Sequence, residues 1–574
     1  MSRITTEEND DEKKQPPPSK PGPVSWLSLP RKDQLLILFL CRLVDFLQVA
    51  SMQAYVFYQL KHMDDSLSDA RISTQAGLLQ ACFTGAQVMT AMLWGKAADA
   101  HWCGRKWVVV IGLAGTAMSC LGYGFATTLF WAAFWRAFGG AVNGTVGVIR
   151  TMISEIIKEK KYQSRAFLIL PMSFNIAGIL GPFFGGMLAS ASTTLPGIFA
   201  PGAILGFRWI QKYPFALPSL MNVFALSLVT AIVTLFLEET SPSRRHLHDP
   251  SLAVGQRIKQ ILFGTKPNAG YSRLTTGESC ALEEENTDTD KEAFTLQPAL
   301  QRRTTTRRRL PLSRIWTSNV IFTLITTAFY DFHLGAFGNI WSLFLSTPRY
   351  LSDDPSAAAA APPPPAASSL QKRSLPLLFT GGLGMPAQTV GLATSFLGVI
   401  GMCLQLTLYP PVHARLGTTR SFRWFLFLFP VCYFVVPYLA VLPSSSPAPE
   451  AASGPLVWLG ILFVLLLAVT ARTFTLPASI IMLNNCSPHP SVLGTIHGLG
   501  QSVSAGFRTV GPVVGGWWYG YGLDIGMVAW GWWGVAIVSA IGCLTALRMY
   551  EGSGHEVRLE GEEEEEEEEE EETI

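Results

Sequence analysis

Charged residues are scarce in this chain, at only 15% of its 574 residues. Soluble domains are about one-quarter charged. The few charges gather in residues 1–34, 238–314 and 551–574, and the long apolar runs between them carry almost none. Such runs are long enough to cross a hydrocarbon layer of about 30 Å. The sequence therefore excludes a single soluble domain and predicts a polytopic membrane protein.

Several chemical signatures are also missing. The nine cysteines form no CxxC pair, which gives no support to a disulfide framework or a zinc site. A net charge of +1 gives no indication of a nucleic-acid partner. The single Gly-Lys dipeptide, Gly95-Lys96, is followed by alanine, so the phosphate-binding loop of an ATP-driven pump is absent. Without a nucleophile–base pair or metal-ligand spacing, we expect neither an enzyme nor a bound cofactor or metal.

Apolar runs separated by helix breakers predict about twelve membrane spans and an all-α fold. The first six spans are expected near residues 35–58, 74–96, 107–126, 128–153, 165–188 and 214–237, and the second six near 318–345, 389–409, 424–442, 455–483, 495–519 and 525–548. An N-terminal half then covers residues 35–237, and a C-terminal half covers residues 315–550.

Four hydrophilic segments flank or interrupt these halves. We expect a disordered cytosolic N-terminus at 1–34, a flexible cytosolic linker at 238–314, an unstructured external insert near 349–375 and an acidic cytosolic tail at 551–574. The tail contains eleven consecutive glutamates, residues 562–572, which repel one another and favour disorder.

The placement of lysine and arginine predicts the orientation of the chain. With the N-terminus inside, the short inner segments hold ten basic residues and the outer segments hold seven, several of them in long loops. We therefore expect both termini in the cytosol. The plasma membrane is the expected location, with the vacuolar membrane as the alternative, and the protein is expected to be a monomer.

The two halves share a repeated motif, GPFFGG in the fifth span and GPVVGG in the eleventh. Its residues are Gly181, Pro182, Gly185 and Gly186 and, 330 residues later, Gly511, Pro512, Gly515 and Gly516. An intramembrane arginine precedes each copy, Arg136 by 45 residues and Arg472 by 39. Two six-helix halves related by a parallel repeat, with the substrate path between them, form one of the main secondary-transporter architectures.

Further motifs resemble the major facilitator superfamily. GKAADAHWCGRK at residues 95–106 resembles its signature loop, with two extra residues between the aspartate and the second glycine. RAFGGAVNG at 136–144 is similar to its second motif, and GPxxGG to the motif of its drug:proton antiporter branch. LEET at 237–240 and the segment 483–517 resemble a fungal branch near the zinc-induced facilitator-like and tetracycline-resistance-like transporters. The resemblance implies a twelve-helix major facilitator fold in which Arg136 takes part in proton coupling.

These motifs also have a mechanical interpretation. Proline removes a helical hydrogen bond and glycine lets helices pack closely, so we expect the GPxxGG segments to seal the path between the halves. In the signature loop, Asp99 can pair with Arg105 across a turn that follows Gly95 and contains Gly104. Making and breaking that pair would bias the two transport states. The alternative is a weak surface ion pair.

Charged side chains inside a bilayer are costly, so each one needs a reason. Arg42 and Asp45 lie one turn apart on a helix face that Gln48 continues. Either the two charges neutralise each other, or Asp45 carries a proton. Arg136 has no partner nearby in the sequence. It either takes part in proton coupling, as the resemblance implies, or anchors to backbone carbonyls.

Span eleven carries one polar stripe, formed by His497, Gln501, Ser504 and Arg508. The stripe either lines the substrate path or satisfies polar groups of neighbouring helices. His497 is also close to the cytosolic end, where an ordinary solvated histidine is the alternative.

Four further residues are candidates for the transport path. In span seven, Asp331 is the second candidate proton carrier, and His333 lies on a different face of the same helix. Asn175 in span five is a candidate substrate contact, with helix packing as the alternative, and Arg472 is the intramembrane arginine of span ten.

Together these features predict proton-coupled export of small amphipathic organic molecules, such as drugs or secondary metabolites. The expected partners are a small-molecule substrate, protons and the lipid bilayer. One alternative is proton-coupled transport of a metal chelate or small nutrient, although His413, His489 and His497 are dispersed. A second alternative is a transporter-like receptor that senses a molecule without moving it.

Overall fold

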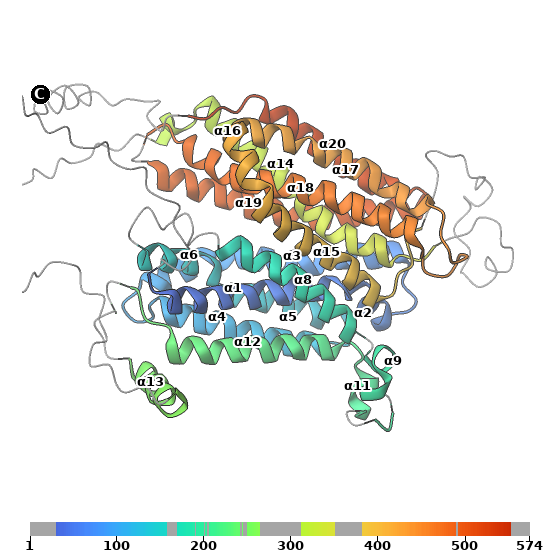
Figure 1. The fold of residues 1–574 in the computed structure, drawn as a ribbon, viewed down its shortest axis with the longest axis horizontal. Helices are drawn as coiled ribbons and strands as arrows, with labels where there is room; N and C mark the ends of the chain where they lie inside the picture. Colours follow the sequence, from blue (N-terminus) through green and yellow to red (C-terminus); the bar gives the residue numbers. More distant parts are fainter. Residues whose placement is uncertain are drawn as a thin grey trace, which may run out of the picture.

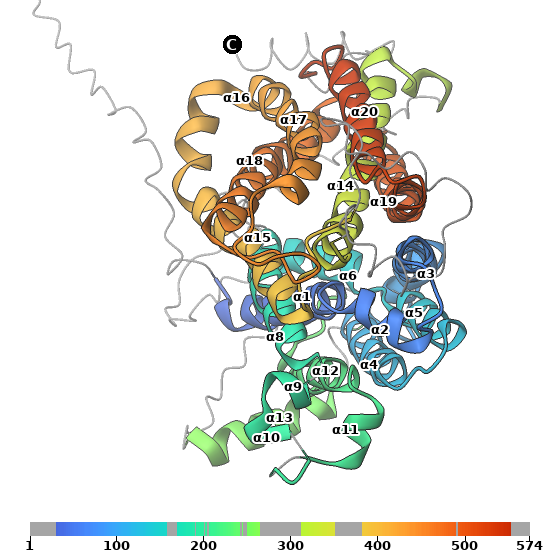
Figure 2. The ribbon, with the colours of Figure 1, turned by 90° about the vertical axis from the view of Figure 1, so that its right-hand side faces the viewer.

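The computed structural model describes residues 30–157, 169–189, 191–199, 201–203, 206–241, 244, 249–263, 312–349, 381–489 and 492–552. These residues form helices and no strand, which confirms the predicted all-α class. Figure 1 shows long helices running side by side, and Figure 2, which looks along them, shows two groups that divide at the middle of the sequence. Most of the expected disordered N-terminus, external insert and acidic tail lie outside the described residues.

The N-terminal half is built from the helices coloured blue to green in Figure 1. They are α1 (Lys32–Gln53), α2 (Val56–Met63), α3 (Asp69–Asp99), α4 (Arg105–Gly124), α5 (Leu129–Val142), α6 (Thr145–Ile156), α8 (Ile169–Leu188), α9 (Ala191–Thr194), α10 (Pro196–Phe199), α11 (Arg208–Lys212) and α12 (Ala216–Phe236). Helices α5 and α6 together occupy the predicted fourth span, which breaks at Asn143 and Gly144.

The C-terminal half repeats this arrangement. Its elements are η2 (Leu312–Ile315), α14 (Ser318–Ser346), α15 (Ala387–Thr407), α16 (Tyr409–Leu426), α17 (Leu428–Val435), η3 (Val436–Val441), α18 (Pro455–Asn485), α19 (Leu493–Asp524) and α20 (Ala529–Ala546). Gly417 interrupts α16 with a positive φ of 70°, a backbone conformation that glycine adopts at no steric cost.

Ten helical segments among the described residues are long and apolar enough to cross a membrane. Two predicted spans are not in that set. The fourth span is divided between α5 and α6, and the eleventh, α19, is rich in glycine and polar residues. A helix nevertheless stands at the position of every predicted span, so the helices are consistent with twelve spans.

Hydroxyl side chains cap several of the long helices. The Oγ atoms of Ser68, Thr128 and Thr317 each accept a hydrogen bond from the backbone N–H three residues ahead, at 3.4, 3.5 and 3.3 Å. A cap of this kind satisfies one of the backbone donors that a helix start leaves unpaired. The loops therefore fix where α3, α5 and α14 begin.

The expected flexible linker is helical in part. Helix α13 (Pro250–Phe263) follows Asp249, whose carboxylate accepts a hydrogen bond of 2.6 Å from Lys106 at the start of α4. The Lys106 side chain is only 1% exposed. A buried ammonium needs a partner, and Asp249 of the linker supplies it. The weak apolar periodicity of the linker did not predict this helix or this contact. Residues 264–311 lie outside the described part of the chain.

The two ends of the bundle are distinct in Figure 1. Helices α6 and α13 lie at one end, and α2, α9 and α11 lie at the other. We call these the α13 end and the α11 end.

Candidate functional site

The glycine motif of α8 contacts two helices at once. A Cβ atom at Gly185 would lie 2.4 Å from the carbonyl oxygen of Ser51 on α1, and one at Gly186 would lie 2.3 Å from that of Ala387 on α15. Helix α1 belongs to the same half as α8, whereas α15 belongs to the other half. Only glycine permits these approaches, so GPFFGG joins the two halves near the α11 end.

The copy of the motif in α19 makes the equivalent pair of contacts. A Cβ atom at Gly511 would lie 2.3 Å from the carbonyl oxygen of Phe332 on α14, and one at Gly516 would lie 2.6 Å from that of Ser73 on α3. One contact is again within the half and the other between the halves. The sequence repeat is therefore also a repeat of contacts.

The prolines of the two motifs lie inside their helices and face the same interface. The carbonyl oxygen of Pro182 would lie 2.1 Å from a Cβ atom at Gly391 of α15, and that of Pro512 would lie 2.3 Å from one at Gly77 of α3. Asn339 on α14 also donates a hydrogen bond of 3.2 Å to the carbonyl oxygen of Pro512. The predicted seal between the halves is thus a backbone-to-backbone seal.

The α13 end is packed more loosely. A Cβ atom at Gly147 on α6 or at Gly498 on α19 would have nothing within 4 Å. Arg150 on α6 and Gln501 on α19 join the halves there by a hydrogen bond of 3.4 Å, and both side chains are exposed. The halves are therefore packed backbone to backbone near the α11 end and are joined by exposed side chains at the α13 end.

Arg42 and Asp45 form the ion pair that their spacing predicts, and both are buried. Asp45 accepts two further hydrogen bonds, from Asn143 Nδ2 at 2.5 Å and from Thr145 Oγ1 at 3.3 Å. Asn143 lies in the break between α5 and α6, and Thr145 is the first residue after it. Asp45 therefore fastens α1 to that break, and this geometry favours a structural role.

Arg136 is buried among side-chain amides. Its guanidinium donates to Gln48 at 3.3 Å and to Gln80 at 3.4 Å, and it lies 4.4 Å from the centre of the Phe83 ring. These contacts replace the backbone carbonyls expected in one of the two interpretations. Among the described residues no carboxylate lies within ion-pair distance of Arg136, and its partners come from α1 and α3.

Asp331 and Arg508 pair across α14 and α19 at 2.6 Å. The carboxylate side chain is 5% exposed and the guanidinium side chain 54%, although Arg508 is at the middle of a long helix. Asp331 is thus buried behind a cation whose side chain is half exposed. Ser504 accepts a second hydrogen bond from Arg508, at 3.3 Å.

The polar stripe of α19 contacts side chains of neighbouring helices. His497 lies 3.1 Å from Asn484 of α18, Gln501 accepts from Arg150, and Arg508 pairs with Asp331. His333 does not join this group. Its Nδ1 lies 3.0 Å from the hydroxyl of Tyr433, in the core of the C-terminal half and away from the interface.

An aromatic pair lies between two guanidinium groups where α1, α8 and α18 meet. Arg42 lies 4.2 Å from the centre of the Phe46 ring, and Arg472 lies 4.0 Å from the centre of the Phe174 ring. The two rings meet edge to face with centres 4.9 Å apart. The Arg472–Phe174 contact crosses from one half to the other. A second cross-contact is adjacent, because Asn175 donates to Gln405 of α15 at 2.7 Å.

The signature loop makes the predicted ion pair and contacts two glutamates elsewhere in the chain. Arg105 lies 3.4 Å from Asp99, whose side chain is 75% exposed, and also pairs with Glu155 of α6. Glu239 accepts hydrogen bonds of 3.1 Å from the backbone N–H groups of Arg105 and Lys106, at the start of α4.

The two glycines of this loop differ in what surrounds them. Gly104 has a φ of +82°, and a Cβ atom there would lie 2.5 Å from Glu239. A Cβ atom at Gly95 would have nothing within 4 Å, so close packing does not explain that glycine.

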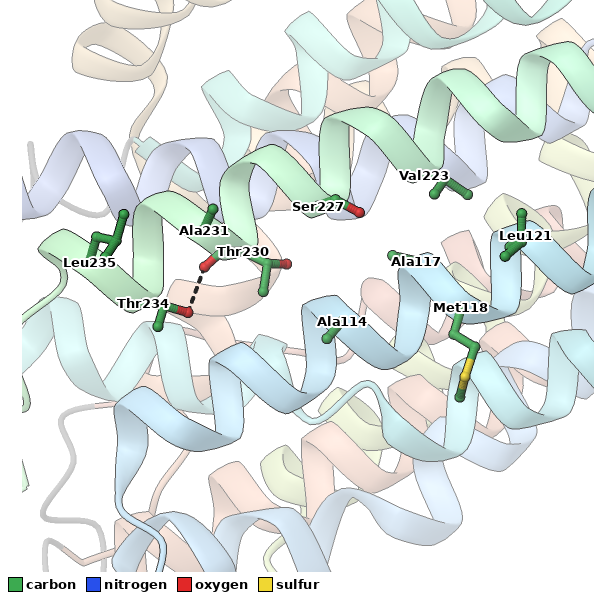
Figure 3. Close-up of a pocket in the computed structure, with 10 residues that line it drawn as sticks. All are labelled: Ala114, Ala117, Met118, Leu121, Val223, Ser227, Thr230, Ala231, Thr234 and Leu235. Atoms are coloured by element: carbon green, nitrogen blue, oxygen red, sulfur yellow. Dashed lines mark hydrogen bonds between the residues drawn. The ribbon is translucent and has the colours of Figure 1, made fainter. Parts of the chain in front are cut away.

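A separate groove of about 610 Å³ lies between α4 and α12. Figure 3 shows its lining of small and apolar residues, such as Ala114 and Met118, and of hydroxyl residues. The hydroxyls of Thr230 and Thr234 donate to backbone carbonyls at 2.7 and 2.8 Å. Figure 2 places α4 and α12 on the side of the N-terminal half that faces away from the C-terminal half. The groove is therefore separate from the interface between the halves.

Comparison with known proteins identifies the family. The sequence profile described as Major Facilitator Superfamily matches residues 34–370. A major facilitator superfamily multidrug transporter of Aspergillus fumigatus is 31% identical over 92% of this chain and 85% of its own length. The chain belongs to the major facilitator superfamily.

Two other similarities agree with this assignment. The zinc-induced facilitator 1 protein of Arabidopsis thaliana is 20% identical over 82% of this chain and 80% of its own length. The crystal structure of a D-xylose–proton symporter has the same fold, with a TM-score of 0.55 at 13% identity, and covers 92% of this chain and 99% of its own. This superfamily member is thus a multi-pass membrane transporter of small molecules, as the motifs predict.

Several residues that make these contacts escaped the sequence analysis. They are Phe46, Gln80, Arg150, Glu155, Glu239 and Gln405. Arg150 lies within a predicted span and could have been found as one more intramembrane charge. Glu239 belongs to the LEET motif that carried part of the resemblance. The amide and phenyl side chains gave no such signal.

Proposed function

We propose that this major facilitator protein exports small amphipathic organic molecules, such as drugs or secondary metabolites, by proton-coupled alternating access. The observation that carries the proposal is the Asp331–Arg508 pair at the middle of the bundle, where the guanidinium side chain is half exposed and the carboxylate is buried. The Aspergillus fumigatus relative, named a multidrug transporter, supports the class of substrate.

The two glycine motifs supply the moving seal in this proposal. Gly186 and Gly516 let the halves touch backbone to backbone near the α11 end. When the halves rock, these contacts open and the α13 end closes. Packed interfaces with two discrete arrangements are suited to such a change, since they do not deform continuously.

Asp331 is the proton carrier that we propose, in preference to Asp45. Asp45 has three donors, from Arg42, Asn143 and Thr145, and a proton on it would disrupt the break between α5 and α6. Among the described residues, Asp331 has one charged partner, Arg508, whose side chain is half exposed. A proton can therefore reach Asp331 and release Arg508 without dismantling a buried network.

The proposal also assigns the orientation. The α13 end faces the cytosol, because Lys106, Arg415, Arg420 and Arg423 lie in the short segments at this end and basic residues favour the cytosolic side. Both termini are then cytosolic. We propose a monomer in the plasma membrane, with the vacuolar membrane as the alternative.

The proposal is tested with purified protein in vesicles that are acidic inside. A panel of amphipathic toxins and metal chelates is offered outside, and their uptake is compared between the intact protein, Asp331→Asn and Asp45→Asn. We expect uptake of a toxin that requires the pH gradient and is lost in Asp331→Asn. Uptake that ignores the gradient would contradict proton coupling, and gradient-driven uptake of chelates alone would favour the nutrient alternative.

A further inference from the structure

The middle of the bundle holds more positive than negative charge. In the spanning helices other than α16, the described positions more than one turn from a helix end include five arginines and two aspartates. The arginines are Arg42, Arg136, Arg150, Arg472 and Arg508, and the aspartates are Asp45 and Asp331. The excess is three positive charges, and a cation in mid-membrane is costly unless something compensates it.

The two aspartates neutralise only two of these arginines. Asp45 pairs with Arg42, and Asp331 pairs with Arg508. Within the described part of the chain, neither Arg150 nor Arg472 has a carboxylate within ion-pair distance.

Three of the arginines lie close together near the interface between the halves. Arg150 donates a hydrogen bond to Gln501, which lies two turns before Arg508 on α19. Arg472 lies one turn before Thr475, whose hydroxyl is 3.0 Å from that of Tyr330. Tyr330 is the neighbour in sequence of the Asp331 that pairs with Arg508. Arg150 bonds across the interface to Gln501, and Arg472 stacks across it on Phe174. Like charges held together in a medium of low dielectric constant repel, and an anion between them would remove that repulsion.

The same place offers an aromatic surface. Phe174 and Phe46 are partly exposed and meet at 4.9 Å between ring centres. A flat aromatic molecule can pack against such rings, and a guanidinium can then contact its π face or its charged group.

We propose that the substrate taken by this interface is an amphipathic organic anion, an aromatic body that bears a sulfonate or carboxylate group. Arg150, Arg472 and Arg508 would bind the anionic group, and Phe174 would pack against the ring. The inference rests on the proposed export function and narrows its class of substrate.

Three fluorescent probes with one ring system test the charge preference: pyrenesulfonate, pyrenesulfonamide and pyrenylmethyl-trimethylammonium. The first is an anion at every pH of interest, the second is neutral and the third is a cation. Binding to the full chain in lipid nanodiscs is measured from pyrene fluorescence. We expect the sulfonate to bind at least about tenfold more tightly than the sulfonamide, which is the scale of one charge-assisted hydrogen bond.

Matched variants locate the site. Arg150→Gln and Arg472→Gln should each weaken sulfonate binding about tenfold and leave sulfonamide binding nearly unchanged, which also shows that the variant is folded. The lysine variants at both positions should retain most of the sulfonate affinity. Arg257→Gln, at an exposed position on α13, serves as the control and should change neither.

The outcomes separate this inference from the proposed function. Cation binding as tight as sulfonate binding, or sulfonate binding that survives both glutamine variants, would overturn the anion inference. Gradient-driven uptake of the neutral or cationic probe without sulfonate binding would also overturn it and leave export standing. Tight sulfonate binding with no uptake of any bound probe would support the anion site and overturn export.

Discussion

Replacing Gly186 by alanine should open the α11 end of the transporter. The added Cβ atom would lie 2.3 Å from the carbonyl oxygen of Ala387 and 3.1 Å from the Cα atom of Gly391. Ordinary contact begins at about 3.4 Å, so α8 and α15 must separate there by roughly 1 Å. Overpacking of this kind costs about 1–3 kcal/mol. Because the cost falls only on the state in which the halves touch, the equilibrium should shift by about 5- to 150-fold toward opening at the α11 end.

The shift is measured by hydrogen–deuterium exchange of the purified protein in nanodiscs. Exchange should rise at residues 387–391 of α15 and 70–77 of α3, which the α11-end contacts protect. Gly516→Ala, whose Cβ atom would lie 2.6 Å from the carbonyl oxygen of Ser73, should act in the same direction. Gly498→Ala is the matched control, because its Cβ atom has nothing within 4 Å. Equal exchange in Gly186→Ala and Gly498→Ala would refute the reasoning.

Three further predictions concern fixed contacts. Burial opposes ionisation of Asp249, but hydrogen bonds from Lys106 and Ser251 outweigh it and hold the pKa of this carboxyl below its ordinary value of 3.8. Attachment of α13 should therefore be complete at pH 5–8 and be lost only as the pH falls through about 4 and below. Asp249→Asn should loosen the attachment at every pH, which limited proteolysis of α13 would report. A loss of attachment already at pH 6 would contradict this prediction. Glu239→Gln removes a negative charge from the start of α4 and should lower the free energy of unfolding by about 1 kcal/mol. The change is measured as thermal stability, and an unchanged stability would contradict the claim that Glu239 caps α4. Asn143→Ala leaves buried Asp45 with one donor fewer and should cost about 1–3 kcal/mol, with a larger stability loss than Asn175→Ala at the partly exposed interface.

The sequence predicted those contacts that local spacing or repetition encodes. Arg42 and Asp45 are one turn apart, so their pairing followed from helix geometry alone. The GPxxGG copies predicted a pair of equivalent seals because glycine permits close backbone approach wherever the repeat places it.

Contacts between distant segments carried no such signal. Arg508 and Asp331 are 177 residues apart, and Asn175 and Gln405 are 230 apart. Arg508, Asp331 and Asn175 were candidates in the sequence, whereas Gln405 was not. Tertiary packing alone decides which of these side chains form contacts. Helix α13 was missed for a related reason, because the partner that holds Asp249 is Lys106, which lies 143 residues earlier in the sequence.

The most direct test of the account is proton movement driven by substrate. Vesicles that hold the purified protein and an acidic interior are mixed with whichever pyrene probe binds, and proton release is followed with a pH-sensitive dye outside. The intact protein should release protons when the probe is added, Arg257→Gln should do the same, and Asp331→Asn should take up the probe, if at all, without releasing protons. Undiminished proton release in Asp331→Asn would contradict the claim that this carboxylate couples proton movement to export.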